Sequence, residues 1–451
     1  MRDYALFLLV FGSIPFILRR PWLGILMWSF LSYANPHRQT WGIAYSFPFA
    51  QLTAITLFAA IALNRQNLSL PKSPILNVWA LFMFWIAVTT MLAVFPDQAV
   101  KQLEKVYKIQ LITLLTILLI KEKRQVIWLV VTICVSIGFY SVKGGLFVIK
   151  TAGAFRVWGP AGSFIEDNNA LATAILIVIP LAFFLFNYYQ DKRLRIAILG
   201  CIVLSFFSAV GSQSRGAMLA TIAMCSFLAL KSKNKALYGL VFVAAIPMLF
   251  AFMPQSWHDR MATIRTYEED GSAMGRLNAW QYSMNIATDR ITGGGFESWS
   301  SMTFARYAPV PDDVHAAHSI WFGVLGDHGW PGLFLFALVF FLTWRELSRL
   351  NKRHRSSIDL QWISDLARMI QVSLVAYFVG GTFLSLAYFD LPWHLMAITI
   401  ILKRFSTEGA KQPKRAGVGV LDATHLERKG PTTAAANQAN TPQPRYSNHG
   451  R

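Results

Sequence analysis

Residues 169–189 read NALATAILIVIPLAFFLFNYY, a predominantly apolar stretch with no charged side chain. A helix needs about 20 such residues to cross the hydrocarbon core of a bilayer, so this stretch is long enough to span a membrane. It has none of the strict alternation of a membrane β-strand, and backbone polar groups in lipid must be bonded within their own segment. We therefore predict a transmembrane helix here.

The rest of the chain repeats this pattern. Hydrophobic residues make up 54% of the 451 residues and charged residues only 14%, against about 25% charged in an ordinary soluble domain. A soluble enzyme of this size is excluded, and we predict an all-α, polytopic integral membrane protein with about twelve transmembrane helices. A thirteenth run, 391–402, is too short to cross comfortably. The twelve runs are 4–18, 21–33, 48–63, 74–95, 106–120, 126–142, 169–189, 196–210, 216–230, 236–252, 320–342 and 369–389.

The basic residues behind the net charge of +19 are concentrated in some of the loops between these runs. Loops rich in lysine and arginine alternate with weakly charged ones, and the positive-inside rule assigns the basic set to the cytoplasm. The basic balance is thus a topology signal that requires no nucleic-acid partner, and membrane lipids are the expected surroundings. The basic loops are 19–20, 65–72, 121–124, 191–195, 231–235 and 345–355, and the opposite set is 34–48, 96–105, 143–168, 211–215 and 253–317.

Composition divides the chain into four parts. We expect an N-terminal transmembrane helix bundle at 1–252, one large periplasmic loop with substrate-binding elements at 253–317, and C-terminal transmembrane helices at 318–402. Several aromatic residues in this loop favour order, among them Trp257, Trp280, Trp299, Phe296, Phe304 and Tyr307. Residues 403–451 are rich in Ala, Pro, Gln, Asn and Thr with scattered basic residues, which predicts a disordered basic cytoplasmic tail.

Arginines stand at the outer ends of the apolar runs, where the positive-inside rule disfavours them. Arg215 opens a predicted helix, where free N–H groups and the helix dipole also favour an anion; the alternative is an arginine that snorkels to lipid headgroups. Arg276 and Trp280 share a helical face, so the indole could hold the guanidinium, although a solvated loop arginine fits equally well. Arg156 is a further outer cation.

Two histidines precede the apolar run at 320. His315 and His318 would share one face of a helix, and they could bind zinc if a third ligand, Asp312 or Asp313, joined them. They could also be interfacial residues without a role. We favour a general base, because imidazole titrates near neutral pH. The three cysteines show no metal or redox spacing, and we expect neither a metal nor another cofactor.

Three short elements resemble those of the O-antigen ligase and polymerase superfamily. Residues 211–217 (GSQSRGA) resemble its Ser-x-Ser-Arg-Gly-Ala element, and 275–280 (GRLNAW) its Gly-Arg-x-x-x-Trp element. Residues 317–319 (AHS) with 329–333 (GWPGL) resemble its His-Asn…Gly-x-x-Gly-Leu element, with Ser319 in place of the Asn. The resemblance covers residues 1–402. The segments 19–22 (RRPW) and 35–38 (NPHR) are similar to a subgroup described as exosortase-associated O-glycosylation ligases.

The resemblance implies a GT-C-like transferase of the bacterial inner membrane whose active site faces the periplasm. His318 becomes the candidate catalytic base, and Arg215 and Arg276 become diphosphate ligands. Arg156, His315 and Trp280 have supporting roles. The resemblance implies an O-antigen ligase that moves a glycan from undecaprenyl diphosphate to a lipid A–core sugar. Polymerase or protein O-oligosaccharyltransferase activity with the same donor is the alternative, and a lipid-linked glycan flippase is a further one.

Overall fold

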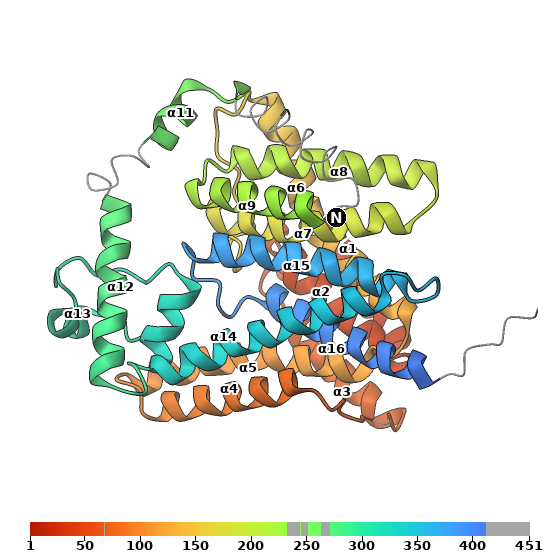
Figure 1. Cartoon of the computed structure of the whole chain (residues 1–451), viewed down its shortest axis with the longest axis horizontal. Coiled ribbons are helices and arrows are strands. Elements are labelled where there is room, and N and C mark those ends of the chain that lie inside the picture. Colours follow the sequence, from red (N-terminus) through yellow and green to blue (C-terminus); the bar gives the residue numbers. More distant parts are fainter. Residues whose placement is uncertain (67, 232–243, 245–250, 263–270, 412–451) are drawn as a thin grey trace, which may run out of the picture. The chain divides into compact units, whose positions relative to one another are not determined.

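The computed structural model describes residues 1–66, 68–231, 244, 251–262 and 271–411. Throughout these ranges the regular structure is helical and no strand occurs, which confirms the all-α class (Figure 1). Met1–Gly409 forms one compact unit, and Ala410–Arg451 is a second unit that lies almost entirely outside the described residues. The longer helices are α1 (Arg2–Arg19), α2 (Trp22–Ala34), α3 (Phe49–Leu63), α4 (Pro74–Met91), α5 (Pro96–Leu119), α6 (Lys123–Lys150), α7 (Asn168–Tyr188), α8 (Lys192–Gly211), α9 (Arg215–Lys231), α11 (Gln255–Ala262), α12 (Gly271–Asp289), α13 (Ser301–Tyr307), α14 (Ile320–His354), α15 (Gln361–Gly381) and α16 (Asp390–Lys411), with short 3-10 turns η1 (Pro36–Gln39) and η2 (Ile43–Tyr45).

Six described helices are long and apolar enough to cross a membrane, namely α4, α6, α7, α8, α14 and α15. Two more, α2 and α3, are apolar but shorter. The structure therefore supports a multi-pass all-α membrane protein but not the predicted count of about twelve helices. Part of the difference lies in α5, which begins at Pro96, ten residues before the apolar run. It includes Lys101 and Lys105, which were assigned to a loop.

The central helices pack in sequence-distant pairs. α15 lies against α7, α9 and α14, while α4 runs beside α14 (Figure 1). The segment 391–402, judged too short to cross, is part of the 22-residue α16. From Leu395 to Leu402 every side chain of this helix is fully buried, and the Trp393 ring packs on Phe82 of α4 and Phe340 of α14. The segment 395–402 is therefore buried on every side within the bundle, so its short apolar run packs in the core.

A kink in α14 shapes one end of the bundle. Gly329 has φ +66°, and a Cβ there would lie 2.0 Å from the Ile291 carbonyl oxygen, so only glycine fits. Residues 293–295 are three consecutive glycines, and they bind the carbonyls freed around the kink. Gly294 N–H donates to the Gly326 carbonyl (2.8 Å), and Gly295 N–H donates to the Asp327 carbonyl (2.9 Å). The glycine triplet is therefore a packing element. Asp327 and His328 are the two residues immediately before this kink.

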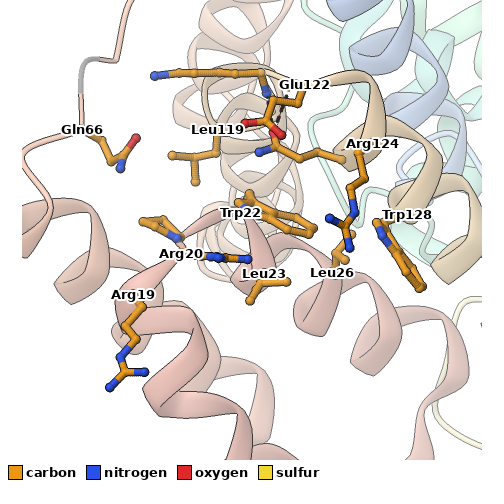
Figure 2. Close-up of a pocket in the computed structure, with 13 residues that line it drawn as sticks. Arg19, Arg20, Trp22, Leu23, Leu26, Gln66, Leu119, Glu122, Arg124 and Trp128 are labelled. Carbon is orange, nitrogen blue, oxygen red and sulfur yellow. Dashed lines mark hydrogen bonds between the residues drawn. The ribbon is translucent and has the colours of Figure 1, made fainter.

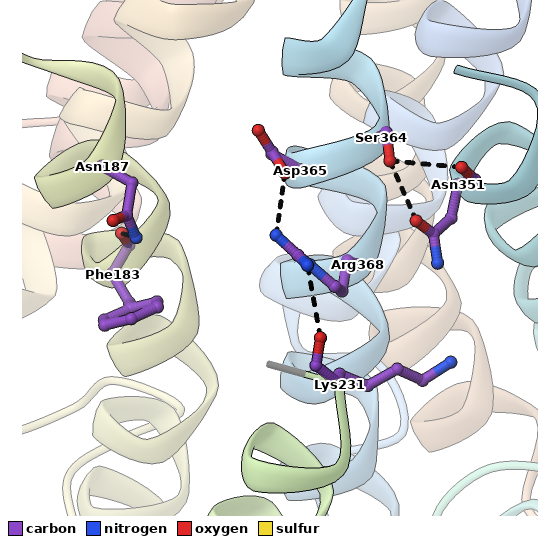
Figure 3. Close-up of polar contacts among 7 residues, drawn as sticks. All are labelled: Phe183, Asn187, Lys231, Asn351, Ser364, Asp365 and Arg368. Carbon is purple, nitrogen blue, oxygen red and sulfur yellow. Dashed lines mark hydrogen bonds and ion pairs between the residues drawn. The ribbon is translucent and has the colours of Figure 1, made fainter. Parts of the chain in front are cut away.

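Polar contacts join α9, α14 and α15 at the opposite end of these helices. Arg368 on α15 donates to the Lys231 carbonyl at the end of α9 (3.2 Å) and pairs with Asp365 (2.8 Å), while Ser364 donates to Asn351 of α14 (Figure 3). A cationic side chain on the last carbonyls of a helix satisfies orphan acceptors there. These contacts fix the C-terminal end of α9, whose N-terminal residue is Arg215.

Much of the predicted loop 253–317 is helical where it is described. Tyr282 of α12 stacks on Phe304 of α13, with ring centroids 4.5 Å apart, and both are fully buried in a small core with Tyr307 and Trp299. The tail from 412 onward, and nearly all of the predicted run 236–252, lie outside the described residues. The boundaries at 252, 317 and 402 and the periplasmic side of the loop stay predictions.

Candidate active site

The corner between α8 and α9 places Arg215. Ser214 caps α9 by accepting a hydrogen bond from Ala217 N–H (3.1 Å), and Ser212 Oγ donates back to the Ala209 carbonyl (2.6 Å). Gln213 between them has φ +56°, a left-handed conformation that makes the turn tight. All three side chains are buried. The serines of the Ser-x-Ser-Arg element thus build the turn, and Arg215 is the first residue of the helix, as predicted.

The first residue of α7 holds this corner in place through a hydrogen bond. Asn168 Nδ2 donates to the Ser212 carbonyl (2.7 Å), and the Asp167 carboxylate caps α7 by accepting from Asn169 and Ala170 N–H. Arg156 reaches the same corner, because its Nε donates to Gln213 Oε1 at 3.5 Å. Arg156 therefore contacts the turn two residues before Arg215, and its supporting role stays a prediction.

Helix α12 carries the second arginine. Arg276 and Trp280 are one turn apart on a regular helix, as their spacing predicts. The Trp280 ring stacks on Phe322 of α14 with centroids 4.7 Å apart and an interplanar angle of 11°. Its Nε1 donates to the Ala317 carbonyl (2.8 Å). Trp280 thus joins α12 to the residue before His318.

Arg215 and Arg276 line one pocket. Its volume is about 560 Å³, and its wall is part polar and part apolar. The polar members come from the starts of α7, α9 and α12, whereas the apolar members come from α9, α12 and the turn after α15. The lining residues are Asn169, Ser214, Arg215, Gly216, Leu219, Ser272, Ala273, Arg276, Leu277, Trp280, Phe383 and Leu384. The fold therefore brings Arg215 and Arg276, which are far apart in the sequence, to the wall of one pocket.

His318 is not among the residues that line this pocket; it lies at the N-terminal end of α14 and follows Ala317, whose carbonyl accepts from Trp280 of the pocket wall. Its backbone has φ +42°, an uncommon left-handed conformation for a residue other than glycine. Ser319, which follows it, caps α14 by accepting from Trp321 and Phe322 N–H. Serine and asparagine both serve well as helix caps, so Ser319 can take the capping place of the usual Asn. His318 keeps part of its surface accessible to solvent.

Three neighbouring charges act on the imidazole. Partial burial and then the positive charge of Arg276 lower the pKa of His318, with a smaller lowering from His315, while the Asp167 carboxylate raises it. The net effect is a pKa below the usual 6.5. At neutral pH the ring is therefore mainly neutral and able to accept a proton.

His315 is placed differently from the prediction. Residues 311–319 are not helical, so the helical spacing argument for His315 and His318 is wrong. His315 Nε2 lies 2.6 Å from Asp313 Oδ1, and its ring packs over Gly275, the residue before Arg276. Across the ranges that the structure describes, no group of three or more His, Cys, Asp or Glu side chains could hold a metal ion.

Two polar residues at the site were not singled out from the sequence. Asn278 of α12 donates to the carbonyls of Val310 (2.8 Å) and Asp313 (2.9 Å) and accepts from Val310 N–H, so it holds the segment that leads to His318. Asp167 contributes the carboxylate near the imidazole. Asn278 stands within the 275–280 element, which was the available signal; nothing local in the sequence pairs Asp167 with His318.

Comparison with known families agrees with the motif resemblance. Residues 200–337 match a family model described as O-Antigen ligase, and residues 1–190 match one described as a family of unknown function (DUF5935). The first match contains Arg215, Arg276 and His318. It supports the resemblance to the O-antigen ligase superfamily over these residues. A search of curated proteins found no match to the chain.

Proposed function

We propose that this chain, whose residues 200–337 match a family model described as O-Antigen ligase, transfers a glycan from undecaprenyl diphosphate to a lipid A–core sugar hydroxyl. The family match supports a glycosyltransferase of ligase or polymerase type, with lipid-linked glycan and lipid acceptor substrates in general. The donor, the acceptor, the metal-independent mechanism and the periplasmic side of the bacterial inner membrane are our proposal.

The observation that carries the proposal is the shared pocket of Arg215 and Arg276. Guanidinium groups bind phosphate oxygens through paired, charge-assisted hydrogen bonds, and two of them match the two phosphates of a diphosphate. The start of α9 adds backbone N–H groups and a favourable dipole. On the same wall, Leu219, Leu277 and Phe383 offer an apolar surface suited to the polyprenyl chain of the donor.

The proposed step is a substitution at the anomeric carbon of the donor sugar. The acceptor hydroxyl oxygen forms a bond to this carbon, while the bond from the carbon to the diphosphate oxygen breaks and its electron pair leaves with the diphosphate. Arg215 and Arg276 stabilise the negative charge that develops there. The proton of the acceptor hydroxyl passes to the imidazole of His318, whose lowered pKa keeps it neutral beforehand.

The acceptor is tested with purified protein in lipid nanodiscs and a defined lipid-linked glycan. Lipid A–core, free glycan and a pilin-like protein are offered in parallel, and the product that carries new glycan is identified by mass spectrometry. Transfer to lipid A–core supports the ligase. Growth of the glycan chain on the donor alone would contradict the ligase proposal and indicate a polymerase. Glycosylation of the protein would indicate an oligosaccharyltransferase. In sealed vesicles, movement of labelled donor without transfer would establish a flippase.

The arginine pair is tested with Arg215→Gln and Arg276→Gln. Each change should raise the donor KM and lower kcat, with little effect on the acceptor KM, because both arginines are assigned to the diphosphate. Arg306→Gln is the matched control: it removes an exposed arginine from the same segment, 3.1 Å from Asp289 and outside the pocket lining. If the donor KM and kcat stayed unchanged in both pocket variants, the arginines would not be ligands of the donor.

A further inference from the structure

A second and larger cavity lies where four helix ends meet. It has a volume of about 880 Å³ and is bounded by the end of α1, the start of α2, the end of α5 and the start of α6 (Figure 2). Nothing in the proposed transfer reaction uses it. Its lining residues are Arg19, Arg20, Pro21, Trp22, Leu23, Leu26, Gln66, Leu119, Lys121, Glu122, Arg124, Gln125 and Trp128, and we call it the basic cavity.

The basic cavity and the candidate active site lie at opposite ends of α6. The first residues of α6 border the basic cavity, whereas Val148, near its last residue, packs against Gly211 beside the Arg215 corner. A helix of 28 residues is about 42 Å long. That length matches a bilayer with its headgroup regions. The two basic pockets therefore belong to opposite membrane surfaces, and the basic loops place this one on the predicted cytoplasmic side.

The wall of the cavity is strongly cationic. Four basic side chains, from Arg19, Arg20, Lys121 and Arg124, stand against one acidic side chain, Glu122. The Glu122 carboxylate takes part in a capping box, in which it accepts from the α6 backbone and Gln125 bonds back to the Glu122 N–H. Its charge is thus directed at the helix start. The excess positive charge calls for an anion, and arginines favour phosphate.

The wall is also amphipathic in a way that fits a lipid. Figure 2 shows the Trp22 ring between the side chains of Arg20 and Arg124, while Arg19 extends away from them. Leu23, Leu26 and Leu119 supply apolar surface, and the exposed Trp128 has the interfacial position that tryptophan prefers in membranes. A soluble phosphate compound would gain nothing from the leucines and tryptophans, whereas a phospholipid uses both parts of the wall.

We propose that the basic cavity binds an anionic phospholipid of the cytoplasmic leaflet. Arg20 and Arg124 bind its phosphate at the mouth of the cavity, and its glycerol and upper acyl carbons contact Trp22, Leu26 and Trp128. Basic pockets between helices on the cytoplasmic side are a known means of holding such headgroups. The site is independent of the proposed transferase activity and of its donor.

Photolabelling tests this site on the full-length protein in detergent with a photoreactive phosphatidylglycerol. Labelled peptides are mapped by mass spectrometry, with unlabelled phosphatidylglycerol, phosphatidylcholine or inorganic pyrophosphate as competitors. We expect labels within 19–26 and 119–128 that only phosphatidylglycerol displaces. Arg20→Gln with Arg124→Gln should reduce this labelling by at least about tenfold, the effect of losing charge-assisted hydrogen bonds.

The matched control is Lys192→Gln with Arg193→Gln, which removes two exposed charges from the same set of basic loops but outside the cavity. Labelling in this control should equal that of the unmodified protein. Equal competition by phosphatidylcholine would overturn the proposal in favour of a nonspecific apolar groove, and competition by pyrophosphate would assign the cavity to a soluble phosphate compound. Because competition is measured on the unmodified protein, the proposal stays testable even where the double variant does not fold.

Discussion

The indole Nε1 of Trp280 donates a 2.8 Å hydrogen bond to the carbonyl oxygen of Ala317. This bond connects the helix that carries Arg276 to the residue that precedes His318. The Gly-Arg-x-x-x-Trp element and the histidine element, separate in the sequence, are thereby held as one unit. The proposed base and one proposed diphosphate ligand depend on this contact for their relative position.

Replacing Trp280 with phenylalanine tests the connection. The variant keeps an aromatic ring to stack on Phe322 but leaves the Ala317 carbonyl without its donor, at a cost of about 1–3 kcal/mol. We expect kcat to fall about tenfold while the donor KM changes little. Trp299→Phe is the control, since it removes a similar bond, to Asp327 (3.3 Å), away from the pocket. An equal kcat loss in the control would mean that any such bond in this region has the same effect.

The proposed base is tested with His318→Asn. Asparagine adopts positive φ more readily than most residues, so it preserves the backbone at φ +42° while removing the imidazole. Loss of general base catalysis should lower kcat by about 10² to 10⁴, with the protein still folded by gel filtration. His315→Asn should reduce activity much less, because His315 is turned toward Asp313. Full transfer by His318→Asn or His318→Ala would end the assignment.

The charges around His318 should affect the pH dependence of transfer activity. A base must be unprotonated, so activity should fall as pH decreases through the pKa of His318, which lies below its usual 6.5. Arg276→Gln removes a positive charge that lowers this pKa, so the acid limb should move to higher pH. Asp167→Asn removes a charge that raises it and keeps a good helix cap, so the limb should move to lower pH. Shifts in the same direction would contradict the assignment.

Metal dependence separates two interpretations of the histidines. The arginine pair can supply the electrostatic stabilisation of the leaving diphosphate, and His318 can take the proton, so transfer should continue in EDTA. The measurement is the initial transfer rate after chelation and gel filtration. Loss of activity that zinc or magnesium restores would instead favour His315, His318 and Asp313 as metal ligands.

The strongest local patterns in the sequence predicted helices correctly. The run 169–189 coincides with α7, and the helical positions of Arg215 and Arg276 follow from capping and spacing. Where charged residues extend an apolar run, as Lys101 does in α5, the helix was read as a loop. Lysines with long apolar stems are tolerated at the ends of such helices, so charge alone does not mark a helix boundary.

The relations between distant segments could not be predicted. Asn278 bonds to carbonyls 32 and 35 residues away, and Asp167 acts on a histidine in another helix pair. Such contacts depend on tertiary packing and leave no periodic or spacing signal in one sequence. The kink at Gly329 had a local signal, the run GDHGWPG, but its partner, the Gly293–Gly295 triplet, became recognisable as a packing element only from the fold.

The kink itself is tested with a pair of alanine substitutions in α14. Gly329→Ala places a Cβ about 2.0 Å from the Ile291 carbonyl oxygen, at a positive φ that costs roughly a further 1–2 kcal/mol. Gly323→Ala meets no atom within 4 Å and lies in regular helix, where alanine is favoured by about 1 kcal/mol. In thermal unfolding in one detergent, Gly329→Ala should lower the midpoint by at least about 5 °C, while Gly323→Ala should leave it unchanged or raise it. Equal midpoints for the two variants would show that the close approach of α14 to Ile291 is not needed for stability.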